Sequence, residues 1–331
     1  MKKIFLISLI FTSIIISQTQ YSPINSMPGA FSRMGFGARG MGMGNAMSAV
    51  KTGNLVSYYN PALSVFQENN SFQTSYSFLS LDRTLSFINF TRKFEFKKES
   101  STNEHQQSKS VAGISSGFII AGVSNIDLRD NEGEIFDNIS TMETQFFISL
   151  SNKFSKKFAL GIAFKFYYYR LYKDIISTAL GVDIGALYSV NDNLNFSIVV
   201  SDLNSAYKWD TGSIYGQNGN TTKNKFPLLK KFGASYKILK PDIIAAIELE
   251  SSNANTNYLR GGIEYNIIRD LYLRCGLDRF NLSNTETPMR PSFGFSYFYE
   301  IKDMKFGIDY AFVIEPYSSS DQHIIGININ F

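Results

Sequence analysis

The sequence predicts an all-β fold, a transmembrane antiparallel β-barrel of about 14 strands. Three observations indicate it: an export signal at the N-terminus, long segments of alternating apolar residues, and a last strand that ends on phenylalanine. Aromatic side chains make up 15% of the 331 residues and charged ones 18%. In a membrane barrel only alternate residues face lipid, so mean hydropathy stays near zero. It is −0.09 here. A soluble exported all-β protein is the alternative class.

The export signal occupies the first residues. Lys2 and Lys3 precede an apolar run from Ile4 to Ile16 that is too short to span a bilayer as a helix. Small and polar residues then supply a cleavage site. We therefore expect residues 1–17 to be a signal peptide and the mature chain to lie in the outer membrane of a Gram-negative-type bacterium.

The alternating segments are longer than a soluble core requires. Every second residue is apolar from 158 to 168, and the same period recurs from 180 to 190. Tilted spanning strands need roughly 9 to 11 residues, whereas soluble strands average about 5 or 6. The predicted strands are 71–80, 84–96, 111–123, 139–150, 157–170, 176–190, 194–201, 229–239, 242–251, 257–266, 271–279, 291–300, 304–315 and 322–331. A change of phase between Phe87 and Phe90 predicts a β-bulge in the second strand.

Connection lengths support the same topology, because outer-membrane barrels alternate short periplasmic turns with long external loops. The predicted turns are 151–156, 191–193, 240–241, 267–270 and 300–303, and the longest loops are 124–138, 202–228 and 281–290. Two connections depart from the rule. The polar segment 97–110 is long on the periplasmic side, and 81–83 is short on the external side.

The last strand carries a local signal. In "HIIGININF", one face holds Ile325, Ile327, Ile329 and the terminal Phe331. This pattern looks like the C-terminal signal read by the outer-membrane assembly machinery. Because an open strand edge in lipid leaves backbone groups unsatisfied, we expect this strand to pair with the first.

Gly35–Gly40 satisfy G-x-G-x-x-G, but the strand, helix and acidic residue that a dinucleotide site also needs do not accompany them. His105 and His323 have no nucleophile or carboxylate at an informative spacing. We expect no enzyme, no cofactor and no metal site. Cys275 is the only cysteine, and its phase predicts that it faces lipid. The 32 basic and 28 acidic side chains are interspersed, which argues against nucleic-acid binding.

Two motifs resemble a known family. They are GARGMGMG at Gly37–Gly44 and NPA at Asn60–Ala62, and the stretches Leu81–Arg83 and Asp309–Phe312 add to them. The chain resembles the PorV/PorQ-type outer-membrane proteins, relatives in fold of FadL-type fatty-acid transporters, although Leu63 stands where that family usually has glycine. The resemblance implies a fourteen-stranded barrel whose N-terminal segment folds inside the lumen as a hatch.

We therefore predict a luminal hatch segment over residues 18–70 and the barrel over 71–331, with a flexible exported linker as the alternative for the former. Glycines let a hatch backbone turn tightly and approach the wall. We also expect Asn45 to cap a short helix over 46–50, with Gly53 just past its end. The motifs single out Gly37, Arg39, Gly40, Gly42, Gly44, Asn60, Pro61 and Ala62 as hatch residues.

Charged side chains fall on the predicted lumen face of the strands. They are Glu143, Lys165, Asp183, Glu248, Glu250, Arg260, Glu264, Arg274, Asp278, Lys305 and Asp309. Because barrel lumens are polar by default, we expect them to form pairs within the wall or between wall and hatch. A ligand or ion path is the alternative.

The resemblance implies a non-enzymatic role in protein export or surface attachment of type IX, in which external loops bind secreted cargo or secretion-system proteins. The alternative is a FadL-like transporter of hydrophobic small molecules such as long-chain fatty acids, and a third possibility is a structural barrel without transport. The segment 201–229 holds the only Trp and two Tyr, which suits protein contact and ligand capture equally.

Overall fold

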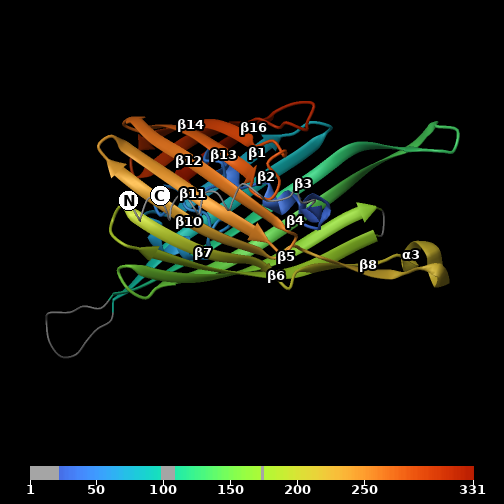
Figure 1. Ribbon diagram of the computed structural model, residues 1–331, viewed down its shortest axis with the longest axis horizontal. Helices are drawn as coiled ribbons and strands as arrows, with labels where there is room; N and C mark the ends of the chain where they lie inside the picture. The colour runs from blue at the N-terminus through green and yellow to red at the C-terminus, as the bar shows by residue number, and fades with distance from the viewer. Residues whose placement is uncertain (1–21, 98–108, 173–174) are drawn as a thin grey trace, which may run out of the picture.

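The computed structural model describes residues 22–97, 109–172 and 175–331. In this part of the chain fourteen strands form a closed antiparallel barrel, and β1 pairs with β16 to close it (Figure 1). The barrel strands are β1 (Ser71–Phe78), β2 (Arg83–Lys97), β3 (Lys109–Arg129), β4 (Ile135–Lys153), β5 (Phe158–Tyr172), β6 (Ile175–Ser189), β7 (Leu194–Leu203), β10 (Leu229–Leu239), β11 (Asp242–Ser252), β12 (Thr256–Ile268), β13 (Leu271–Asn281), β14 (Arg290–Ile301), β15 (Met304–Val313) and β16 (Gln322–Asn330).

The remaining elements are short. Strands β8 (Ala206–Asp210) and β9 (Thr221–Lys225) pair only with each other. The helix α3 (Gly212–Tyr215) and the 3-10 helix η4 (Gly216–Asn218) connect them. Before β1 lie the 3-10 helices η1 (Pro23–Ser26), η2 (Phe31–Arg33) and η3 (Pro61–Phe66) and the helix α2 (Gly37–Gly42). Within the described residues, no helix has the length and apolarity needed to cross a membrane.

All fourteen predicted strands are present, with ends that differ by a few residues. The turn end of the barrel carries the short connections 154–157, 190–193, 240–241, 269–270 and 302–303. The opposite end, here called the loop end, carries the longer connections 204–228, 282–289 and 314–321. The predicted alternation of short and long connections is confirmed at these positions. Most of the polar segment 97–110 and the predicted signal peptide lie outside the described residues.

Two predicted loops contain strands. The connection predicted at 124–138 is mostly an extension of β3 and β4, which pair as far as Arg129 and Ile135. The predicted loop 202–228 contains the hairpin of β8 and β9. Both hairpins project from the loop end (Figure 1). These predictions were wrong because the alternation is short in both hairpins, four residues at Ile126–Arg129 and five in β8, and is interrupted by polar residues.

The predicted bulge in β2 is also wrong. β2 pairs with β1 and β3 without a register shift. Leu85 and Phe87 point into the lumen and are fully buried, while Ile88 and Phe90 belong to the outward series. The apparent change of phase arises because the lumen face of β2 is apolar where it meets the N-terminal segment: the Phe87 ring lies 4.9 Å from that of Phe36.

The outer face of the barrel is apolar, as a surface in contact with lipid must be. Cys275 is exposed on this face, in agreement with its phase. The C-terminal residues Ile325, Ile327 and Phe331 are exposed and Ile329 is half-buried. Other exposed large apolar side chains on the strands include Ile88, Phe118, Ile120, Ile148, Phe164, Phe166, Ile184, Phe196, Ile198, Phe232, Ile247, Ile263, Leu273, Phe293 and Ile308.

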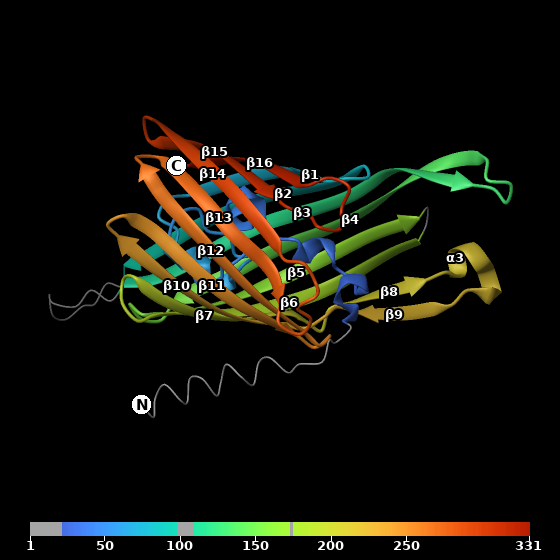
Figure 2. The same ribbon diagram turned by 45° about the horizontal axis from the view of Figure 1, so that its top comes forward.

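The N-terminal segment lies inside the lumen (Figure 2). Helix α2 packs against β13, β14, β15, β16 and β1, while η3 packs against β2 to β6 on the other side. The segment therefore reaches around the wall, and its side chains Met41, Met43, Leu55 and Leu63 are almost completely buried. This is the luminal hatch segment of the predicted fold.

One prediction within the hatch is wrong. No helix covers 46–50; the helix of this region is α2, which ends at Gly42. Asn45 has φ +61°, not the extended backbone of an N-cap residue. Its side chain amide instead donates to the Asp278 carboxylate at 3.2 Å, and its amide oxygen accepts from the Tyr59 hydroxyl at 2.8 Å.

Candidate functional site

The NPA motif begins η3 and fixes the hatch to the wall. The Asn60 side chain accepts from the Ala62 backbone N–H at 2.9 Å, as an N-cap does, and Pro61 occupies the first helical position, where its missing N–H is not needed. The same side chain donates to the Ser48 carbonyl at 2.8 Å and to the Ala186 carbonyl in β6 at 3.2 Å. Asn60 therefore joins two hatch segments and one wall strand.

The glycine-rich motif allows close packing at two positions. The Tyr59 side chain covers Gly40, where an added Cβ would overlap the Tyr59 hydroxyl. Gly44 has φ +59°, and a Cβ there would lie 2.5 Å from the Leu277 backbone nitrogen in β13. Glycine is required at Gly44 both for its backbone conformation and for its contact with the wall.

Arg39 connects α2 to the wall through a buried ion pair. Its guanidinium lies 2.7 and 2.9 Å from the two Glu264 carboxylate oxygens, and it donates to the Thr52 carbonyl at 2.8 Å. Arg274 approaches the same carboxylate at 2.6 Å and also donates to Ser296 at 2.5 Å. Ser296 donates to Asp309. One carboxylate thus compensates two buried arginines.

A second cluster surrounds Arg260 on β12. Its guanidinium contacts Asp278 at 2.6 Å, Glu250 at 2.9 Å and Glu248 at 3.2 Å. The hatch takes part again, since the Ser48 backbone N–H donates to Glu248 at 3.2 Å. Because a charge removed from water is stable only when paired and hydrogen-bonded, these contacts keep the ionised groups buried.

The third cluster belongs to the wall. Lys165 lies 2.7 Å from Asp183 and 3.3 Å from Asp202, and the Tyr167 hydroxyl donates to Asp202 at 2.5 Å. Asp202 has φ +61° and sits where the pairing of β6 with β7 shifts register. Asp202 was not predicted as a lumen-facing charge, because a bulge reverses which residues face inward.

The predicted lumen-facing charges have different kinds of partner in the structure. Glu264, Arg274, Arg260, Asp278, Lys165 and Asp183 join the three clusters, and Asp309 accepts from Asn328 at 2.6 Å. Lys305 pairs with Asp270 at the turn end, at 2.5 Å. Glu143 is half-buried and has no ion-pair partner among the described residues. No group of His, Cys, Asp and Glu in the described part of the chain is arranged to hold a metal ion.

A cavity of about 370 Å³ lies between the hatch and the loop end. Part of its lining is apolar, formed by Phe31, Met34, Leu79, Leu85 and Ala121 among others. Polar groups line the rest. They include the charged Arg33, Arg83, Glu143, Arg279, Arg290 and Glu315, together with Gln322 and several hydroxyl side chains. Arg290 Nε and Gln322 Oε1 are buried without a hydrogen-bond partner.

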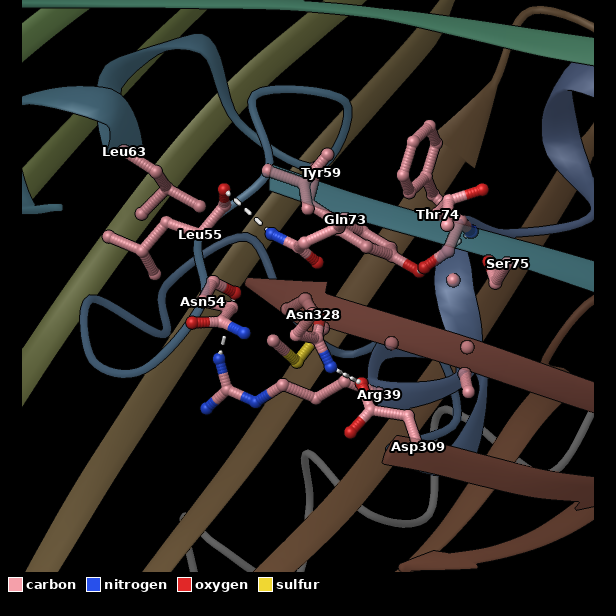
Figure 3. Close-up of a pocket in the computed structure, with 17 residues that line it drawn as sticks. Arg39, Asn54, Leu55, Tyr59, Leu63, Gln73, Thr74, Ser75, Asp309 and Asn328 are labelled. Carbon is pink, nitrogen blue, oxygen red and sulfur yellow. Dashed lines mark hydrogen bonds between the residues drawn. The ribbon is translucent and has the colours of Figure 1, made fainter. Parts of the chain in front are cut away.

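Two more cavities lie on the path to the turn end. One of about 320 Å³ is at the turn end itself, lined by Arg39, Glu264, Arg274, Lys305 and Asn330 among others. Between it and the loop end is a gap of about 20 Å³ between the hatch and the wall (Figure 3). Gln73, Thr74, Ser75, Asp309 and Asn328 form its wall side, and Arg39 extends into it from the hatch (Figure 3).

Sequence reasoning missed an aromatic cluster where the β8–β9 hairpin meets the lumen. The Phe226 ring lies 4.6 Å from Tyr167 and 5.0 Å from Tyr207, and Trp209 lies 5.2 Å from Tyr169. Phe226 also covers Gly29 of the hatch. The alternation of Tyr207 and Trp209 with Lys208 and Asp210 is a strand signal, but it covers only five residues. Arg33, Arg279 and Arg290 were missed as well.

No family model matches this chain, and no curated protein matches it. Solved structures do. The chain is similar to the Pseudomonas putida toluene transporter TodX, with a TM-score of 0.58 and 14% identity over 90% of this chain and 99% of that one. It is also similar to the Ralstonia pickettii toluene transporter TbuX, with a TM-score of 0.52 and 11% identity over 89% and 97% of the two chains.

A Pseudomonas aeruginosa FadL homologue gives the same TM-score of 0.52, with 11% identity over 89% of this chain and 98% of that one. At such identities the likeness shows the fold alone. The chain has the fourteen-stranded architecture of FadL-type channels over nearly its whole described length. None of these findings supports the PorV/PorQ part of the resemblance.

Proposed function

We propose that this protein is a non-enzymatic outer-membrane channel for hydrophobic small molecules, which it captures in the loop-end cavity. The observation that carries the proposal is the apolar part of that cavity's lining, next to a hatch whose core side chains are almost completely buried. Ligand sites are typically concave and mostly apolar with a few polar groups that fix orientation. The similarity to two toluene transporters and a FadL homologue supports the same class of substrate.

The close packing of the hatch favours capture of a ligand over its free diffusion through the lumen. Leu55 and Leu63 are about 1% exposed, and the three ion clusters occupy the lumen wall beside them. A molecule that enters from the loop end therefore meets a closed floor. Its apolar surface contacts Phe31 and Leu85, and its position in the cavity leaves Arg290 and Glu143 beside any polar end.

The proposal is tested by filling the cavity. Ala121 and Ile120 are neighbours on β3, but Ala121 lines the cavity and Ile120 is exposed on the outer face. Ala121→Trp should lower uptake of radiolabelled toluene or dodecanoate by about tenfold, equivalent to about 1.4 kcal/mol. Ile120→Trp should leave uptake unchanged. Equal uptake by both variants, at equal amounts of folded protein, contradicts the proposal.

Protein export through the external loops is the other predicted function. The feature that favours it is the pair of projecting hairpins, on which Ile135, Phe136 and Tyr215 are more than half exposed. None of the comparisons supports this function. If it is correct, replacing residues 127–137 with a short turn should abolish secretion of cargo and leave toluene uptake intact.

A further inference from the structure

The three cavities lie one after another along the same part of the wall, formed by β15, β16 and β1. On β16, Gln322 lines the loop-end cavity, Gly326 and Asn328 line the narrow gap, and Asn330 lines the turn-end cavity. Leu79, which directly follows β1, borders the first cavity, and Ser75 on β1 borders the second. The residues run in strand order, so the cavities form a series from one end of the barrel to the other.

The wall residues that line this series are mostly polar. The inward residues of β1 are Ser71, Gln73, Ser75 and Ser77, and those of β16 are Gln322, Ile324, Gly326, Asn328 and Asn330. The buried apolar residues Ala311, Val313 and Ile324 line none of the three cavities. Buried amides and hydroxyls lose free energy when an apolar surface replaces water beside them. The wall therefore favours hydrophilic solutes, whereas part of the lining of the loop-end cavity is apolar.

Along this wall the hatch is held by apolar packing, in which Met41 shares a buried cluster with Ala311 and Ile324, and by few hydrogen bonds. Within the described residues, β15 and β16 make no hydrogen bond to residues 22–67, and β1 makes only a long one from Gln73 to the Leu55 carbonyl, at 3.5 Å. Helix α2, which covers these strands, has no side-chain cap at its N-terminus. A Cβ added at Gly37 would meet only Ser75 Oγ, at 3.8 Å. Displacing α2 from β15 and β16 therefore breaks few hydrogen bonds to these two strands, while Arg39 and Gly42 of the helix remain bonded to Glu264 and Ser292.

We propose that the strands β15, β16 and β1 line a second path, which admits water and small uncharged hydrophilic solutes through the lumen when α2 moves. The path goes beyond the proposed capture of hydrophobic molecules and does not depend on it. In the closed structure the narrow gap of about 20 Å³ has room for about one water molecule. Movement of α2 joins the cavities on either side.

The first test changes the width of the gap. Gln73→Ser shortens a side chain in the gap that makes only weak hydrogen bonds, at 3.4 and 3.5 Å. Gln145 on β4 is the matched control, because it is also buried and inward-facing, makes no hydrogen bond and lines none of the cavities described above. In proteoliposome swelling with arabinose, Gln73→Ser should raise the rate by at least about twofold, since pore width sets permeation, and Gln145→Ser should not.

The second test locks α2 in place and does not depend on Gln73. A Cβ built on Gly42 lies 3.7 Å from the Ala311 Cβ in β15, within the range that a disulfide bridges. Gly42→Cys with Ala311→Cys, in a Cys275→Ser background, should abolish arabinose permeation when oxidised, and dithiothreitol should restore it. The control pair Ser64→Cys with Ser151→Cys joins η3 to β4, whose hydroxyls are hydrogen-bonded at 2.5 Å. Its oxidation should not change permeation.

Three results would overturn the proposal: no effect of the oxidised α2 lock, an equal effect of the η3 lock, or equal rates for the two glutamine variants. Toluene uptake separates this path from the proposed function. If toluene uptake fails in the wild-type protein while the arabinose results hold, the polar path stands and the hydrophobic substrate is wrong.

Discussion

The hatch meets two kinds of wall. From β10 to β13 and on β6 and β7 it is fixed by hydrogen bonds and ion pairs, which include Arg39 with Glu264 and Ser48 with Glu248. Along β15 and β16 the described part of the hatch makes no hydrogen bond or ion pair and is held by packing, such as the contact between α2 and Ala311. The hatch is therefore held by directional polar contacts on one side and by apolar packing on the other.

Wall glycines follow the same division. On the fixed side, a Cβ at Gly262 would overlap the Met43 carbonyl, and one at Gly276 would overlap the Gly44 backbone nitrogen. On the other side, a Cβ at Gly326 would come no closer than 3.3 Å to any atom, and its nearest atoms all belong to the wall. The hatch backbone is therefore seated directly on glycines of the fixed side.

The largest expected effect comes from removing the hatch. Deletion of residues 22–64 should leave a barrel that assembles, because closure depends on the pairing of β1 with β16. Its lumen should then carry large, steady single-channel currents in planar bilayers, since a barrel of about fourteen strands is wider than one filled by side chains. Currents at the wild-type level from a folded barrel would show that the hatch does not close the lumen.

Removing the carboxylate that pairs with Arg39 on the fixed side should have the next largest effect. Glu264→Ala leaves Arg39 and Arg274 buried without their common carboxylate, at a cost of about 3–5 kcal/mol. The hatch should become sensitive to protease and the channel should leak. Asp309→Asn is the control on β15, where the hatch makes no hydrogen bond. Asp309 accepts hydrogen bonds from Asn328 and Ser296, and among the described residues it forms no ion pair with an arginine. If both variants resist protease equally, the two walls hold the hatch equally.

Alanine substitutions at wall glycines compare the two sides of the wall directly. Gly262→Ala forces the Met43 backbone to move and should lower the free energy of unfolding by about 1–3 kcal/mol. Gly326→Ala should cost less, since the added methyl group meets its neighbours at 3.3 Å or more. The temperature at which each variant loses its fast-migrating form on unboiled gels measures the difference. A larger loss for Gly326→Ala would contradict the division.

The smallest effect is expected at Asn60. Asn60→Ala removes the cap of η3, worth about 1 kcal/mol, together with its bonds to the Ser48 and Ala186 carbonyls. The barrel should remain folded, and planar-bilayer recordings should show brief openings rather than the steady current of the deletion. Asn60→Asp keeps the cap oxygen but loses the donor, so it should open less often than Asn60→Ala.

The strands were predictable because the alternation that marks each strand lies within its own residues. Alternation over 158–168 marks a surface with lipid on one side, whatever the rest of the chain does. The two failures at 124–138 and in β2 have a common cause. The alternation rule assumes that one face of a strand contacts lipid and the other contacts water. Neither place fits it: the extended hairpin is solvated on both faces, and Phe87 on the inner face contacts the hatch.

The sequence by itself determined the barrel, its closure, the order of its connections and the inward phase of Arg260 and Glu264, because a period of two residues fixes which side chains share a face. It did not determine which charges meet. Arg39 and Glu264 are 225 positions apart, and Asp202 enters the lumen through a bulge. Only the tertiary structure decided these pairs and which part of the wall holds the hatch without hydrogen bonds, because they depend on how the hatch lies across strands that are distant in sequence.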